Sequence, residues 1–209
     1  LAPAAAPRLD REKLLEFRAA DGSVQPVRSA ADWARRRAEI VAGAEAVMGA
    51  LPSASKRVPL EVKVGLATDN TKPNRNYGEE LARRGFVVLA PPYPHLADYK
   101  PDLRGLGYAS GTMKAVWDNI RGLDVLAATP GVSPRGFGAI GHSLGGHNSI
   151  FTALFDERVK AVVSSCGFDS FLDYYQEKQA AVWKPGQAWG QDRYMPRISA
   201  YAGRLAEIP

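Results

Sequence analysis

The sequence predicts an α/β fold with a mostly parallel sheet, helices on both faces and an N-terminal helical extension. From about Gly65 onward, apolar strand-like runs alternate with helix-like segments, which favours a parallel sheet with right-handed crossovers. Residues 86–90 are apolar throughout, as expected of a strand that is covered on both faces. We therefore expect one α/β domain in residues 51–209, with residues 1–50 packed on it as a leader and helix.

The N-terminal part contains one clear helix signal. Residues 1–7 are rich in Ala and Pro, follow no helix or strand period, and are expected to form a flexible leader. Ser29 precedes a helical stretch over 30–48, and its hydroxyl can cap the exposed amides, with Asp32 three residues further on. The apolar residues of this helix recur at helical spacing: Trp33, Ile40, Ala44 and Val47.

The next segments alternate between strand and helix. Residues 58–64 alternate apolar and polar side chains, which is typical of a half-buried strand. Residues 77–84 are expected to form a helix that ends at Gly85, where glycine tolerates a left-handed backbone. The apolar strand 86–90 follows.

Four more elements complete the predicted pattern. Ser110 can cap a helix that extends to about residue 128. Residues 137–140 are expected to form a strand, 145–154 a helix and 161–165 another strand.

The residues at 141–146, Gly-His-Ser-Leu-Gly-Gly, contain the pattern G-x-S-x-G between a strand and a helix. In that context the pattern indicates a nucleophile elbow, which forces Ser143 into a strained backbone and presents its hydroxyl at the carboxyl edge of the sheet. We expect Gly141 and Gly145 to be required because a side chain at either would collide in so tight a turn. The amide of Leu144, at the start of the helix, can donate to a developing oxyanion.

These residues resemble a known superfamily. Residues 141–146 resemble the elbow of α/β-hydrolases, and residues 74–198 are similar to bacterial hydrolases of the dienelactone hydrolase, acetyl xylan esterase and prolyl oligopeptidase-like group. The similarity is most specific in 89–94, 108–114 and 164–167, and the N-terminal helix with residues 31–33 also resembles the leader of such proteins. The resemblance implies an α/β-hydrolase-type sheet, a serine nucleophile and ester or amide substrates, with no metal and no organic cofactor.

A serine nucleophile needs a base, and the histidines do not provide an obvious one. In α/β-hydrolases the histidine of the triad follows the serine and the acid along the chain, but no histidine follows His147. We expect His147, on the helix after the elbow, to be structural. His95 and His142 are expected to contact substrate.

The resemblance implies where the missing groups are. Complete members of the group continue past the position of residue 209 with strand–helix units that supply the triad Asp and His, and they have further strands before the equivalent of Gly65. We therefore expect the chain to lack an internal segment and the C-terminal part, and to be inactive alone. It could be a fragment, a natural truncation or an engineered piece.

The acidic residues after the elbow are Asp156, Asp169, Asp173 and Asp192, and none is nominated as the triad acid. Asp156 is interpreted as part of a solvated turn, and Asp169 as a helix cap or a residue facing the site. Cys166 lies beside an apolar strand and is expected to be a small buried side chain.

Aromatic residues gather after the strand 161–165. They could form a wall of the substrate site or ordinary packing, and the sequence leaves both open. They are Phe168, Phe171, Tyr174, Tyr175, Trp183, Trp189 and Tyr194.

Composition and charge exclude several classes of binding partner. The 209 residues include 27 Lys and Arg against 22 Asp and Glu, a net charge of +5. The densest basic cluster, Arg35, Arg36 and Arg37, points in several directions around a helix, which indicates a solvated face and no nucleic-acid partner. The longest apolar runs are far shorter than the ~20 residues that span a bilayer, so no membrane partner is expected. A single cysteine excludes an intramolecular disulfide and a Cys-rich zinc site.

The sequence therefore predicts a serine hydrolase that acts on carboxylic esters, carbohydrate acetyl esters among them, through an acyl-enzyme on Ser143. Two alternatives stay open: a serine peptidase of the prolyl oligopeptidase-like type, and a non-catalytic binding module that keeps the elbow. The Ala/Pro-rich leader slightly favours a secreted or periplasmic location over a cytoplasmic one. The natural substrate and the oligomeric state are left open.

Overall fold

The structure, a computed structural model, describes residues 9–10, 12–56, 76–169, 185–186 and 188–201. The predicted strand 58–64 lies outside the described residues. The chain divides into two compact units, the first with residues 1–51, 102–113 and 169–209, and the second with residues 52–101 and 114–168. The predicted division into 1–50 and 51–209 stays a prediction.

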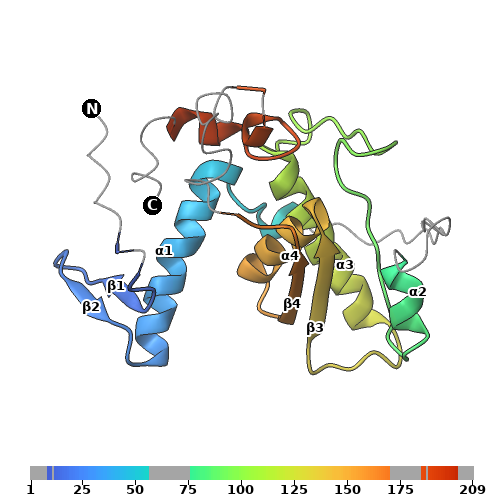
Figure 1. The fold of residues 1–209 in the computed structure, drawn as a ribbon, viewed down its shortest axis with the longest axis horizontal. Helices are drawn as coiled ribbons and strands as arrows, with labels where there is room; N and C mark the ends of the chain where they lie inside the picture. The colour runs from blue at the N-terminus through green and yellow to red at the C-terminus, as the bar shows by residue number, and fades with distance from the viewer. Residues whose placement is uncertain (1–8, 11, 57–75, 170–184, 187, 202–209) are drawn as a thin grey trace. The chain divides into compact units, whose positions relative to one another are not determined.

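The first unit contains a hairpin that the sequence did not predict. Strands β1 (Glu16–Arg18) and β2 (Val24–Pro26) pair antiparallel across a turn in which Gly22 has φ 85°. Phe17, at the centre of β1, is buried, and the hairpin packs on helix α1 (Ala30–Met48) (Figure 1). Strands of three residues are too short to show the alternation that a sequence pattern needs.

Helix α1 has the predicted bounds and the predicted cap. The Ser29 hydroxyl oxygen accepts the Asp32 amide at 3.1 Å, and the Asp32 carboxylate accepts the Ser29 hydroxyl at 2.8 Å and the Arg28 amide at 3.2 Å. The apolar stripe is buried only toward its end, because Val47 is buried whereas Trp33 is 45% exposed.

Three more helices agree with the sequence in position. Helix α2 (Tyr77–Ala82) ends before Gly85, which has φ 88°. Helix α3 (Gly111–Ala128) directly follows Ser110, whose hydroxyl oxygen accepts the Met113 amide at 3.0 Å. Helix α4 (Leu144–Phe155) follows the elbow. The described residues also form three short 3₁₀ segments: η1 (Ala54–Lys56), η2 (Ala188–Gly190) and η3 (Pro196–Tyr201).

The second unit contains a small parallel sheet. Strand β3 (Phe137–His142) pairs in parallel with β4 (Val159–Ser165), and α4, which connects them, packs against both (Figure 1). This strand–helix–strand order confirms the predicted parallel pairing. The last residues of the two strands, His142 and Ser165, are partners in the register and share one edge.

Two predictions about the sheet are wrong where the structure describes the chain. The run 86–90 forms no strand, and its side chains are exposed, with Phe86 at 62%. A parallel strand is buried only when neighbours pair with it, and this run has no strand partner in the described part of the chain.

Helices on both faces of the sheet are also not seen among the described residues. Helix α4 covers the face of Gly141 and Ser164, since a Cβ at Gly141 would lie 2.2 Å from the Gly145 carbonyl carbon. The opposite face is exposed, with Ile140 at 43% and its register partner Val163 at 55%. The sheet that is shown has two parallel strands with its helix on one face.

Candidate active site

Ser143 lies between β3 and α4 in the geometry that the motif predicts. Its backbone has φ 52° and ψ −118°, a region that a residue with a Cβ rarely adopts. Two hydrogen bonds hold it there: the Ser143 amide donates to the Ser165 carbonyl oxygen at 2.7 Å, and the His147 amide donates to the Ser143 carbonyl oxygen at 3.0 Å. The strain is thus maintained by the neighbouring strand and by the first turn of the helix.

The elbow depends on two glycines, Gly141, which was expected, and Gly146, which was not. At Gly141 a Cβ would meet the backbone of Gly145 at 2.2 Å, as predicted. At Gly145 a Cβ would meet nothing within 4 Å, so that expectation is wrong. At Gly146 it would lie 2.8 Å from the Ser164 hydroxyl and 3.0 Å from the Gly141 carbonyl oxygen. The close approach of helix and sheet therefore depends on Gly141 and Gly146.

The Ser143 hydroxyl is available for chemistry. Ser143 occupies the N-cap position of α4, yet its side chain makes no capping bond and is exposed to solvent. Leu144 is the first residue of α4, so its amide belongs to the turn whose N–H groups have no partner within the helix. Such amides, at the positive end of the helix dipole, can stabilise negative charge.

His142 contacts a serine other than Ser143. The imidazole Nδ1 of His142 lies 3.1 Å from the hydroxyl oxygen of Ser165, and both side chains are exposed. Sequence reasoning did not single out Ser165. A signal was present, because His142 follows the predicted strand 137–140 closely, Ser165 ends the predicted strand 161–165, and the carboxyl ends of paired parallel strands meet at one edge.

His147 is buried in the second unit and packs its ring edge-to-face on Phe151, with centroids 4.8 Å apart. Burial lowers its pKa from 6.5 to about 4. A buried imidazole that packs on Phe151 fits the structural role that the sequence suggests.

His95 lies in an exposed loop with a strained backbone, φ 59°. Its amide donates to the Tyr99 carbonyl oxygen at 2.7 Å. The Tyr99 hydroxyl donates to Asp118 at 3.0 Å and accepts a hydrogen bond from Lys114 at 2.9 Å, so this loop is fixed on α3. No hydrogen bond joins His95 to Ser143 in the described structure, and its predicted contact with substrate stays a prediction.

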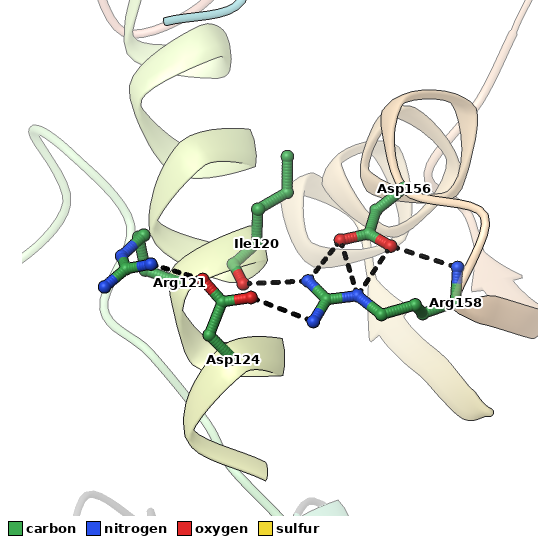
Figure 2. A network of polar contacts seen from close by, with 5 residues as sticks. All are labelled: Ile120, Arg121, Asp124, Asp156 and Arg158. Carbon is green, nitrogen blue, oxygen red and sulfur yellow. Dashed lines mark hydrogen bonds and ion pairs between the residues drawn. The ribbon is translucent and has the colours of Figure 1, made fainter. Parts of the chain in front are cut away.

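Asp156 is not part of a solvated turn, so that interpretation is wrong. It ends α4, is only 9% exposed, and its carboxylate accepts two hydrogen bonds from Arg158 Nε and one from Nη2, at 2.6 to 3.1 Å (Figure 2). Arg158 also donates to Asp124 at 2.8 Å and to the Ile120 carbonyl oxygen at 3.4 Å. The hydrogen bond with Asp156, together with Asp124, raises the pKa of Arg158.

The structure shows no role in a triad for the other acidic candidates among the described residues. Asp169 is exposed at the end of the segment after β4, and the Asp192 carbonyl oxygen accepts the Gly111 amide at 2.6 Å. Asp173 lies outside the described residues.

Cys166, expected to be buried, is exposed. The thiol follows directly after β4, where the backbone turns with φ 51°, and the exposed face of the sheet leaves it open to solvent. The Cys166 side chain is therefore at the same strand edge as Ser143.

The aromatic cluster is only partly described. Phe168 is exposed and lies 6.4 Å from Phe151 between ring centroids, whereas Trp189 and Tyr194 pack edge-to-face at 5.1 Å. The remaining four, Phe171, Tyr174, Tyr175 and Trp183, lie outside the described residues. Packing between rings accounts for Trp189 and Tyr194.

Two arginines of the basic cluster on α1 make contacts within the first unit. Arg35 lies over the Phe17 ring, 5.6 Å from its centroid, and Arg36 pairs with Glu39 at 3.0 Å. Arg36 is therefore not simply solvated as expected, because its side chain is 19% exposed.

None of the described helices is long and apolar enough to cross a membrane. The described part of the chain holds no group of three or more His, Cys, Asp or Glu side chains that could bind a metal ion. Comparisons of the chain with protein-family models, with curated proteins and with solved structures found no match.

Proposed function

We propose that the chain is the elbow-bearing part of a serine hydrolase that cleaves carboxylic esters by acyl transfer to Ser143. The observation that supports this proposal most is the backbone of Ser143, held at φ 52° and ψ −118° between β3 and α4 with an exposed, uncapped hydroxyl. Such strain is retained only where surrounding contacts maintain it, and it is common at functional sites. Carbohydrate acetyl esters and other small esters are the substrate class that the resemblance suggests.

The proposed chemistry assigns a role to each group at the elbow. The Ser143 oxygen attacks the ester carbonyl carbon, the Leu144 amide donates to the oxyanion, and the alcohol leaves as the acyl-enzyme forms. A base must accept the Ser143 proton. The buried, neutral His147 does not suit this role, and the resemblance assigns it to a histidine outside residues 1–209, together with the triad Asp.

The alternative of a non-catalytic binding module is favoured by one observation. In the described residues the imidazole nearest the elbow along the chain, that of His142, hydrogen-bonds to Ser165 instead of Ser143. A module of this kind would bind acyl groups at the edge without turning them over.

Labelling and turnover distinguish the two. The full-length protein should carry fluorophosphonate on Ser143 and hydrolyse p-nitrophenyl acetate over many turnovers, and Ser143→Ala should remove the label at that position and the repeated turnover. Ser133→Ala, an exposed serine in the same unit, is the matched control and should leave both unchanged. Wild-type protein that shows neither labelling of Ser143 nor turnover would favour the binding module.

A further inference from the structure

The carboxyl edge of the small sheet holds a second serine beside a histidine. Ser165 Oγ and His142 Nδ1 are 3.1 Å apart, which is hydrogen-bond distance for a hydroxyl donating to an imidazole nitrogen. Both side chains lie on the exposed face of the sheet, so reagents in solvent can reach them. A nucleophile and a base within this distance are the minimal pair for nucleophilic catalysis.

The backbone fixes this pair. His142 and Ser165 are the final residues of β3 and β4 and are partners in the parallel register. The bond from the Ser143 amide to the Ser165 carbonyl oxygen, 2.7 Å, ties the strand ends together just beyond the pair. Reactive groups on paired strands are held more precisely than groups on loops.

We propose that Ser165 is a second nucleophile, with His142 as its general base, which accepts acyl groups from activated carboxylic esters and phosphonyl groups from organophosphonates. This assignment is separate from the role of Ser143. It requires the tautomer of His142 in which Nδ1 carries the lone pair and Nε2 carries the hydrogen.

The step balances without a further reactant. The Ser165 oxygen forms a bond to the ester carbonyl carbon while its proton passes to His142 Nδ1. The bond from that carbon to the leaving oxygen then breaks, and the leaving alcohol takes the proton from His142. The products are acyl-Ser165 and the alcohol. With a fluorophosphonate, the oxygen–phosphorus bond forms and fluoride leaves.

Tryptic mapping separates this proposal from the proposed function. In the full-length protein, trypsin places Ser143 on the peptide 136–158 and Ser165 on the peptide 161–178, and fragmentation of each labelled peptide assigns the label to one of its serines. We expect fluorophosphonate on Ser165 in the wild type and in Ser143→Ala. Absence of label on 136–158 would count against the proposed function alone, and absence of label on Ser165 overturns the present proposal.

Two variants test the role of the histidine. His142→Asn keeps a hydrogen-bonding side chain but removes the base, and should slow labelling of Ser165 by about 10²-fold or more. Ser164→Ala, which alters the neighbouring serine on the other face, is the control and should label Ser165 at the wild-type rate. Circular dichroism melting confirms that each variant is folded. An unchanged rate in His142→Asn would show that the contact is only structural and would overturn the proposal. Should that variant fail to fold, the wild-type map decides by the presence or absence of label on Ser165.

Discussion

Arg158, which precedes β4, donates to the carboxylate of Asp124 on α3 at 2.8 Å. The same guanidinium binds Asp156 at the end of α4, and Arg121 pairs with Asp124 from the other side (Figure 2). One arginine thereby joins α3, α4 and the start of β4 within the second unit. These are the elements that position the elbow at the opposite end of the strands.

Replacement of Arg158 should destabilise the second unit. Arg158→Leu leaves the carboxylates of Asp156 and Asp124 without this partner, and Asp156 is only 9% exposed. Removing one member of a largely buried ion pair costs more than the pair itself contributes, so we expect a loss of about 2 kcal/mol in the free energy of unfolding. Urea denaturation measures it.

The control for this network is Arg121→Leu, which removes a contact with Asp124 on the same helix and leaves the Arg158 guanidinium in place. Both residues of this pair lie on α3, so the contact joins no second element, and the loss should be smaller than that in Arg158→Leu, about 1 kcal/mol. Equal losses in the two variants would contradict the bridging role of Arg158.

The two glycines that follow Leu144 should respond oppositely to alanine. A Cβ at Gly146 would press on Ser164 and on the Gly141 carbonyl oxygen, so Gly146→Ala should cost about 1–3 kcal/mol through overpacking. A Cβ at Gly145 meets nothing within 4 Å, and Gly145→Ala should stabilise the protein by about 0.5–1 kcal/mol because alanine favours a helix. Thermal melting ranks the variants, and the reverse order would contradict the geometry.

Local signals in the sequence predicted local structure well. The start of α1 follows from Ser29 and Asp32, which form the cap within four residues, and the position of Ser143 follows from the glycines between a strand and a helix. Each of these signals depends on neighbours along the chain. They were confirmed because the backbone geometry that they specify is also local.

Features that depend on distant partners were not predictable. The run 86–90 has the composition of a buried strand, but burial requires neighbouring strands that its own residues do not specify. Asp156 was assigned to solvent although its partner Arg158 is only two residues further along the chain. The sequence does not show that the same guanidinium also binds Asp124 on α3. The choice between Gly145 and Gly146 depends on which face of α4 meets the sheet.

Relief of the strain at Ser143 should stabilise the protein. A residue with a Cβ at φ 52° and ψ −118° costs roughly 1–3 kcal/mol, whereas glycine tolerates positive φ. Ser143→Gly should therefore be more stable than Ser143→Ala by about 1 kcal/mol, after the larger backbone entropy that glycine loses on folding. Denaturant midpoints of the two variants measure the difference, and an alanine variant at least as stable as the glycine variant would show that the turn is unstrained.

The burial of His147 should make stability depend on pH. Its pKa is lowered from 6.5 to about 4 in the folded protein. Above pH 6.5 the imidazole is neutral in both states, but between pH 6.5 and about 4 the unfolded chain binds a proton that the folded chain does not. Stability is therefore lost as the pH falls through this window, by roughly 3 kcal/mol in total, and this contribution changes no further below pH 4.

The variant His147→Gln isolates this contribution because glutamine is similar in size and does not titrate. Urea denaturation of the wild type and the variant at several pH values between 4 and 7.5 gives the difference in their free energies of unfolding. Other groups that titrate in this range contribute equally to both proteins and cancel in that difference. We expect the advantage of the wild type to shrink steadily as the pH falls below 6.5. A difference that stays constant over the whole range would show that His147 is protonated as easily in the folded protein as in the unfolded chain.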